Sequence, residues 1–266
     1  MPDHPFFRGL RPTLHIAHRG GAALAPENTL PPFEAAVERW KTDVLELDLQ
    51  LSADGELVVF HDETVDRCTD GGGRVDEHDL AALARLDAGH RFTPDGGRTF
   101  PFRGQGVRIP TFREVLRRWP TSRLNVELKV DRPGAAEALA GLLREEGAVE
   151  RVCVGSELDG VGLRLAELLP EGCHFYPREL LVQAVMALKL GGEPPADERF
   201  LVLDMPLHHQ GVRLVDAAFV EAARSFGRWV NVWTVDDEED MRQLVRDGVG
   251  GIMTDRPDLL RRILAE

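Results

Sequence analysis

A short stretch in the first quarter of the chain can bring two carboxylates and an imidazole to one place. Residues 46–62 read ELDLQLSADGELVVFHD. Because side chains alternate between the two faces of a strand, Glu46 and Asp48 project from the same face. The Asp54-Gly55 pair between two apolar runs predicts a β-hairpin with a two-residue turn. In that register Asp48 lies directly opposite His61, with Cβ atoms ~5 Å apart.

A third carboxylate, Glu127, lies at the end of another strand-like segment, residues 124–128. Three convergent carboxylates suit a hard divalent cation, Mg²⁺ or Ca²⁺, better than zinc. A lone acidic residue at a strand end is more simply explained as solvated or paired with arginine. Glu46 and Asp48, however, alternate with large apolar residues, and a buried carboxylate without a counter-charge is costly. We therefore expect one cation at Glu46, Asp48 and Glu127.

The same strand ends carry bases and cations. His18 and His61 lie beside the acids, and two imidazoles can act as base and acid near neutral pH. Arg19 and Lys129 can bind an anion such as phosphate, although Arg19 also fits a salt bridge. Trp233 fits the core as well as a substrate wall. Structural or surface roles are expected for the remaining histidines: His4, His15, His78, His90, His174, His208 and His209.

Strand-like and helix-like segments alternate along the chain. The expected strands are 14–17, 44–49, 124–128, 151–154, 173–176, 200–204, 229–233 and 251–253, with 58–61 as an antiparallel return. The expected helices are 29–40 (capped by Asn28), 111–119, 134–146, 158–169, 179–190, 215–226, 238–247 and 257–265. Eight strand–helix units favour the α/β class and a closed (β/α)₈ TIM barrel over an open doubly wound sheet, which usually has fewer strands. Active sites of such barrels lie at the carboxyl ends of the strands.

We expect one domain, residues 1–266, with an inserted segment at about 62–110. This segment lies between the hairpin and the next helix and is rich in Gly, Asp and Arg. A loop of this length in a compact domain is usually functional or a small subdomain. Leu80, Leu83 and Leu86 at helical spacing predict one short helix inside it.

Composition limits the possible partners. The formal net charge of −13 over 266 residues argues against a nucleic-acid surface. Neither a signal peptide, a membrane span nor an interfacial anchor is recognisable, so we expect no stable membrane insertion. The three cysteines have no paired or metal-ligand spacing, which favours a reducing cytoplasm. The oligomeric state is left open.

Taken in order, several motifs resemble the glycerophosphodiester phosphodiesterase family over nearly the whole chain. The motifs are His18-Arg19-Gly20, Pro26-Glu27-Asn28-Thr29, Glu46-Leu47-Asp48, His61-Asp62, Asp66-Arg67-Cys68-Thr69-Asp70-Gly71, Leu86-Asp87-Ala88-Gly89, Ile109-Pro110-Thr111, Asn125-Val126-Glu127-Leu128-Lys129, Val230-Asn231-Val232-Trp233-Thr234-Val235 and Gly251-Ile252-Met253-Thr254-Asp255-Arg256-Pro257. The resemblance implies a phospholipase C-like barrel with a divalent metal on Glu46, Asp48 and Glu127. It also implies that His18 and His61 are the acid–base pair and that Arg19 and Lys129 hold phosphate.

This resemblance predicts hydrolysis of a small-molecule phosphodiester, such as glycerophosphocholine or glycerophosphoethanolamine, to glycerol 3-phosphate and an alcohol. It places the chain in lipid and glycerol metabolism. Three alternatives stay open. The first is a lysophospholipase D-like activity on lipid substrates, and the second is a Schiff-base aldolase that uses Lys129. The third is a non-catalytic barrel that binds phosphate compounds.

Overall fold

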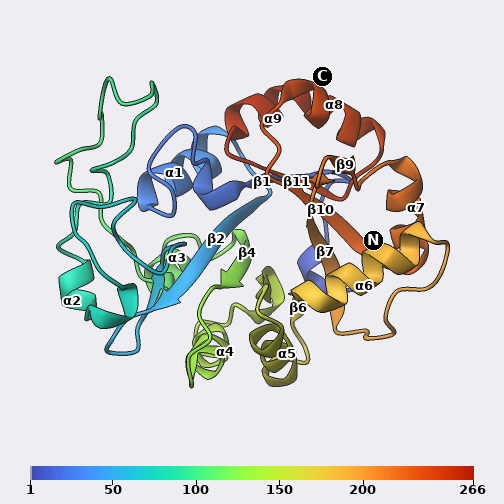
Figure 1. Ribbon diagram of the computed structural model, residues 1–266, viewed down its shortest axis with the longest axis horizontal. Helices are drawn as coiled ribbons and strands as arrows, with labels where there is room; N and C mark the ends of the chain where they lie inside the picture. The colour runs from blue at the N-terminus through green and yellow to red at the C-terminus, as the bar shows by residue number, and fades with distance from the viewer. Residues whose placement is uncertain (1) are drawn as a thin grey trace.

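A ring of eight parallel strands encloses the centre of the molecule, as the computed structural model of residues 2–266 shows (Figure 1). Around the ring the strands follow the order β1-β11-β10-β7-β6-β5-β4-β2, and pairing of β1 with β2 closes it. The predicted (β/α)₈ TIM barrel is therefore confirmed. The strands are β1 (Leu14–Ala17), β2 (Val44–Leu51), β4 (Arg123–Leu128), β5 (Val152–Gly155), β6 (Cys173–Phe175), β7 (Phe200–Pro206), β10 (Trp229–Trp233) and β11 (Gly251–Thr254).

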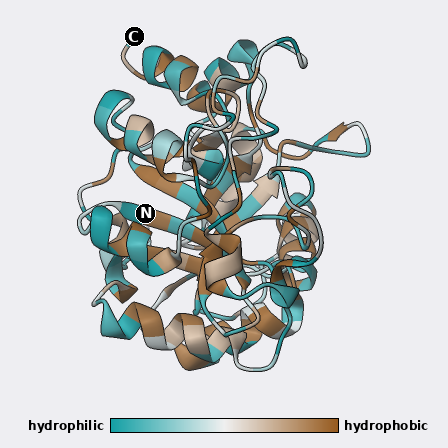
Figure 2. Ribbon diagram, turned by 90° about the vertical axis from the view of Figure 1, so that its left-hand side faces the viewer, coloured by the Kyte–Doolittle hydropathy of each residue, from teal (hydrophilic) through white to brown (hydrophobic). Residues whose placement is uncertain are grey.

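Helices cover the outside of the ring. They are α1 (Leu30–Glu34), which continues as a π-helical turn (Ala35–Arg39), α3 (Phe112–Arg118), α4 (Ala135–Glu145), α5 (Asp159–Leu168), α6 (Arg178–Lys189), α7 (Ala217–Ser225), α8 (Glu238–Arg246) and α9 (Pro257–Ile263). The strands are mostly apolar (brown in Figure 2), whereas the outer turns of the helices are mixed. Strands buried on both faces need such continuous apolar runs, which is why the sequence marks them clearly. No helix within residues 2–266 combines the length and apolarity needed to cross a bilayer.

The hairpin that follows β2 differs from the prediction by one residue. The return strand β3 (Leu57–Val59) pairs Leu49 with Val59 and Leu51 with Leu57. The ladder therefore places Phe60, not His61, opposite Asp48, and the Phe60 amide donates to the Asp48 carbonyl oxygen at 3.0 Å. The cause is a three-residue loop, because only Gly55 has a positive φ (+86°), whereas a two-residue type I′ turn needs two such residues. The predicted turn and the directly opposed Asp48–His61 pair are wrong.

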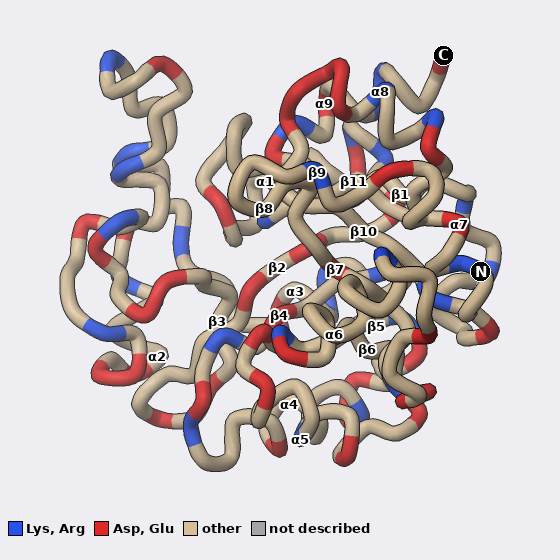
Figure 3. The backbone as a smooth tube through the Cα atoms, turned by 45° about the vertical axis from the view of Figure 1, so that its right-hand side comes forward, with Lys and Arg blue, Asp and Glu red and all other residues tan. Residues whose placement is uncertain are grey.

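The segment between β3 and α3 has its own small apolar cluster beside the barrel, formed by residues such as Val65, Val75, Leu83 and Ile109. It contains the predicted short helix, α2 (Leu80–Leu83). In Figure 3 this segment lies to one side of the barrel, next to β3, while acidic positions mark β2 inside the barrel. The segment is therefore placed to contribute residues to the mouth near β2.

Candidate active site

A cavity of about 550 Å³ opens at the carboxyl ends of the barrel strands. All eight residues singled out in the sequence line it: His18, Arg19, Glu46, Asp48, His61, Glu127, Lys129 and Trp233. Charged groups from β2, β4 and the turn after β1 form one side of it, and α6 contributes an apolar wall on another. The barrel thus brings together residues that lie more than 200 positions apart.

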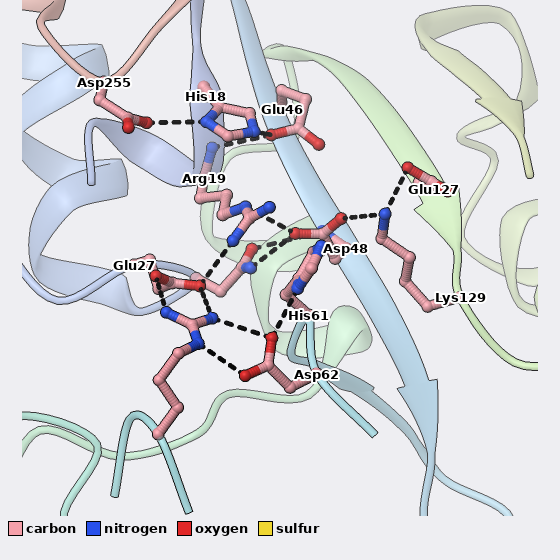
Figure 4. A network of polar contacts seen from close by, with 12 residues as sticks. His18, Arg19, Glu27, Glu46, Asp48, His61, Asp62, Glu127, Lys129 and Asp255 are labelled. Carbon is pink, nitrogen blue, oxygen red and sulfur yellow. Dashed lines mark hydrogen bonds and ion pairs between the residues drawn. The ribbon is translucent and has the colours of Figure 1, made fainter. Parts of the chain in front are cut away.

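His18 is fixed by a carboxylate from the last strand–helix connection. Its Nδ1 lies 2.7 Å from Asp255 Oδ1, and its Nε2 lies 3.9 Å from Glu46 Oε2 (Figure 4). Burial lowers the pKa of His18, but the charges of Glu46 and Asp255 more than offset it, so the pKa lies above its usual value. The imidazole is therefore oriented, and its Nε2 edge is the one nearest the acids of the cavity.

A tight turn after β1 places Arg19 against the acids. Arg19 has a positive φ (+48°), and the next residue, Gly20, has φ +86°. A Cβ atom on Gly20 would lie 2.8 Å from the ring of Phe33, so the turn requires glycine here. The backbone amide of Arg19 donates to Glu46 Oε2 at 2.8 Å, and the Nη1 of its side chain donates to Glu27 Oε1 at 2.9 Å.

Asp48 is held from two sides. Asn28 Nδ2 donates to Asp48 Oδ2 at 2.9 Å, and Arg19 Nε lies 3.2 Å from the same oxygen. Burial raises the pKa of Asp48, but Arg19 and Lys129 outweigh it, so the pKa is lowered. The prediction that Asn28 caps the first helix is wrong: Thr29 takes the cap position, without a side-chain hydrogen bond. Asn28 instead has φ +57° and turns its amide to the site.

Two further carboxylates, Glu46 and Glu127, are buried with less compensating positive charge than Asp48. Burial and the neighbouring Asp48 charge raise the pKa of Glu46 to about 7. Burial also raises the pKa of Glu127 to about 7, although the Lys129 Nζ donates to Glu127 Oε2 at 2.8 Å. The same ammonium lies 3.5 Å from Asp48 Oδ1. Lys129 therefore bridges two of the three predicted metal ligands.

His61 belongs to a chain of charges that reaches the inserted segment. Its Nδ1 lies 2.6 Å from Asp62 Oδ1, and Arg67 donates to both oxygens of Asp62. Arg67 also makes two 2.7 Å bonds to Glu27, which in turn holds Arg19. The Gln50 amide donates to the His61 carbonyl at 3.0 Å. His61 is thus positioned by side chains from β2 and from the insertion; Figure 4 shows its contact with Asp62.

The expected three-carboxylate group is present in the cavity but not gathered on one point. Within residues 2–266, no three His, Cys, Asp or Glu side chains lie together as an ion would require. The donor chemistry nevertheless fits a hard cation, since all three candidates offer carboxylate oxygens. Two of them, Glu46 and Glu127, also have pKa values raised by burial, and a bound cation would relieve that cost.

Sequence reasoning gave no role to several residues that orient the site. Asp62 and Asp255 hold the two histidines, while Glu27 and Arg67 link Arg19 to Asp62. Asp62 directly follows His61 in the sequence, and Asp255 directly follows β11 at the mouth of the barrel. A charged residue next to a candidate histidine or to a strand end is the feature of the sequence that could have revealed these residues.

The mouth of the (β/α)₈ barrel holds two histidines oriented by carboxylates, beside a guanidinium and an ammonium, and such a set of groups suits cleavage of a phosphodiester. The glycerophosphoryl diester phosphodiesterase family model matches residues 18–259. A glycerophosphodiester phosphodiesterase of Caldanaerobacter subterraneus is 37% identical over 93% of this chain and 96% of its own length. The chain therefore belongs to the glycerophosphoryl diester phosphodiesterase family, and its enzyme class is that of the phosphoric diester hydrolases.

More distant relatives extend this comparison. Human lysophospholipase D is 26% identical over 94% of this chain and 85% of its own length. An Oleispira antarctica phosphodiesterase, solved in complex with the product sn-glycerol-3-phosphate, superposes with a TM-score of 0.72 at 26% identity, over 94% of this chain and 96% of that one. The domain of a Mycobacterium tuberculosis protein of this family shares the fold with a TM-score of 0.84 at 24% identity, over 95% and 98% of the two chains.

Proposed function

We propose that this enzyme hydrolyses glycerophosphodiesters such as glycerophosphocholine and glycerophosphoethanolamine to glycerol 3-phosphate and an alcohol. The observation that carries the proposal is the pair of carboxylate-held imidazoles, His18 and His61, lining one cavity with Arg19 and Lys129. The sn-glycerol-3-phosphate bound to the Oleispira relative supports this product. The three free cysteines support a place in the reducing cytoplasm, and a glycerol 3-phosphate product would belong to lipid and glycerol metabolism.

Glu46, Asp48 and Glu127 would hold one divalent cation, Mg²⁺ or Ca²⁺. Dependence on a divalent metal is general in this family, and the incompletely compensated burial of Glu46 and Glu127 supports it in this chain. When bound, such an ion lowers the pKa of a coordinated hydroxyl and offsets charge on phosphoryl oxygens.

Arg19 and Lys129 would bind the phosphate. The Arg19 Nε is buried and has no hydrogen-bond partner among residues 2–266, although it lies 3.2 Å from Asp48 Oδ2. The Arg19 guanidinium nevertheless lines the cavity, and a phosphate oxygen is an acceptor that suits a guanidinium. Lys129 lines the same cavity and supplies a second positive charge for the developing negative charge.

The two histidines would move the protons. His18, held at Nδ1 by Asp255, has its Nε2 available to take the proton from a glycerol hydroxyl, whose oxygen attacks phosphorus. His61, held at Nδ1 by Asp62, has its Nε2 available to give a proton to the departing alcohol oxygen. The cyclic phosphate that results is then opened by water, with the two histidines in reversed roles.

Lysophospholipids are a second candidate substrate. Leu181, Val182, Val185 and Met186 on α6 line the cavity, and Val182 and Met186 are each 56% exposed. Such a wall would accept an acyl chain on the glycerol, and the human relative is named a lysophospholipase D. A Schiff-base role for Lys129 is disfavoured. Burial lowers the pKa of Lys129, but Glu127 and Asp48 more than offset it, so the amine stays charged instead of nucleophilic.

A coupled assay for glycerol 3-phosphate tests the proposal. Several glycerophosphodiesters and a lysophospholipid are supplied, first with chelator and then with Mg²⁺ or Ca²⁺ added back. We expect product only with metal, and a loss of at least 100-fold in kcat for His61→Ala. His90→Ala, a histidine of the inserted segment outside the cavity, is the matched control. Absence of product from every substrate with metal present would remove the proposed function.

A further inference from the structure

One carboxylate in the cavity has no part in the chemistry described above. Asp204 on β7 lines the cavity floor. Asn125 Nδ2 donates to its Oδ2 and Asn231 Nδ2 donates to its Oδ1, each at 2.7 Å. Across residues 2–266, no lysine, arginine or histidine nitrogen forms an ion pair with it. Two neutral amides do not cancel a charge, and burial raises the pKa of Asp204 to about 6, so this carboxylate lines the cavity without a cation to compensate it.

Aromatic rings flank this carboxylate on both neighbouring strands. On one side Phe175 of β6 pairs with Val202, two residues before Asp204 on the same face of β7. On the other side Asn231 of β10 pairs with Asp204, and Trp233 follows two residues later on the same face. Diagonal neighbours of this kind are about 7–8 Å apart. Phe175, Asp204 and Trp233 all line the cavity, but the Phe175 ring lies over Gly155 of β5, so Trp233 is the ring left beside the carboxylate.

The charges of the cavity are separated. Arg19 and Lys129 lie at the end formed by the turn after β1 and by β4, whereas Asp204 and the two rings lie on β6, β7 and β10. A cation over an aromatic face is stabilised by the ring quadrupole, and quaternary ammonium groups are recognised in this way. A zwitterion with a phosphate and an ammonium group matches this separation in one orientation only, with its phosphate at Arg19 and Lys129.

We propose that Asp204 and Trp233 form a subsite for a cationic leaving alcohol of the quaternary ammonium class, such as choline. This inference rests on the proposed phosphodiesterase function and adds the choice of head group to it. Asp204 supplies the counter-charge and Trp233 supplies the contact face, while Asn125 and Asn231 hold the carboxylate in place. A neutral head group would leave Asp204 uncompensated, so it should be the poorer substrate.

The first test uses the wild-type enzyme with metal present. Choline and its uncharged isostere 3,3-dimethylbutan-1-ol are compared as competitive inhibitors of glycerophosphoglycerol hydrolysis. We expect an inhibition constant at least tenfold lower for choline. Equal inhibition by the two compounds would overturn the subsite. Failure to hydrolyse any glycerophosphodiester would instead refute the proposed function, so the two failures are distinguishable.

The second test uses Asp204→Asn and measures kcat/KM for glycerophosphocholine and glycerophosphoglycerol. We expect the variant to lose at least tenfold more on the choline substrate, mainly through KM. Glu157→Gln is the matched control, because Glu157 also lines the cavity but is paired with Arg178; it should change both substrates equally. An equal loss on both substrates in Asp204→Asn would assign Asp204 to the glycerol hydroxyls and overturn the proposal.

Discussion

Replacing His15 with leucine should protect the enzyme against acid. His15 lies on β1, fully buried, and neither of its ring nitrogens has a hydrogen-bond partner among residues 2–266. Burial, together with the positive charges of Arg11 and Arg261, lowers its pKa from 6.5 to about 3. The folded protein therefore keeps this imidazole neutral at pH values at which the unfolded chain protonates it.

The sign and size of the effect follow from this difference. Below pH 6.5 the unfolded state binds more protons at His15, so stability is lost as the pH falls from 6.5 towards 3. A solution at pH 4.5 is two pH units below the pKa of 6.5 that His15 has in the unfolded chain. At 1.36 kcal/mol per unit, the free energy of unfolding is therefore lowered by about 3 kcal/mol. For a chain of this length, that is a shift in Tm of roughly 5 °C. His15→Leu removes this loss and leaves no unpartnered nitrogen.

The assay is thermal unfolding of both proteins at pH 7.5 and at pH 4.5. The difference in Tm between His15→Leu and wild type should be larger at pH 4.5 than at pH 7.5, by roughly 5 °C in favour of the variant. His174→Leu is the control, because this buried histidine has carbonyl partners at both nitrogens, Val154 O and Leu169 O. The control should be less stable than wild type already at pH 7.5. If the Tm of wild type and that of His15→Leu fell by the same amount between pH 7.5 and pH 4.5, the reasoning would be refuted.

Three further outcomes concern the site. Asp255→Asn should lower kcat by about 100-fold with little change in Tm, because it leaves His18 in place but no longer held by a carboxylate; near-normal turnover would contradict the positioning role. Arg67→Gln should lower kcat roughly tenfold through Asp62, whereas Arg74→Gln in the same inserted segment should not, and equal effects would refute the link. Added Mg²⁺ or Ca²⁺ should raise the Tm of wild type but not of Glu127→Gln, and a rise in both would remove Glu127 from the metal site.

The sequence predicts most of the barrel because its strands are buried on both faces. Such strands appear as apolar runs, and parallel pairing places their carboxyl ends, with His18, Glu46 and Glu127, at one mouth. The hairpin register was not predictable in the same way, because it depends on a single backbone conformation at Gly55. Asp54-Gly55 fits both a two-residue and a three-residue loop, and the ladder alone distinguishes them.

Side-chain partners were harder to predict than strands. The residues around Asn28 do not show whether it caps a helix or forms a hydrogen bond with Asp48, since asparagine suits both roles. Lys129 was expected to meet phosphate, yet in the structure its ammonium lies between Glu127 and Asp48. Such pairings depend on distances between strands that the sequence does not contain. The residues of the site are therefore easier to predict from the sequence than the hydrogen bonds and ion pairs between them.

In the proposed mechanism, the bond between His18 and Asp255 ties catalysis to closure of the barrel. The two residues are 237 positions apart and follow β1 and β11, the first and last strands of the ring. Those strands meet only when the ring closes, through four register pairs from Leu14–Gly251 to Ala17–Thr254. A barrel with β11 detached would keep Glu46, Asp48 and His61 on β2 and its hairpin but would leave His18 unoriented. Opening of this one pairing should consequently abolish turnover even where the rest of the barrel stays folded.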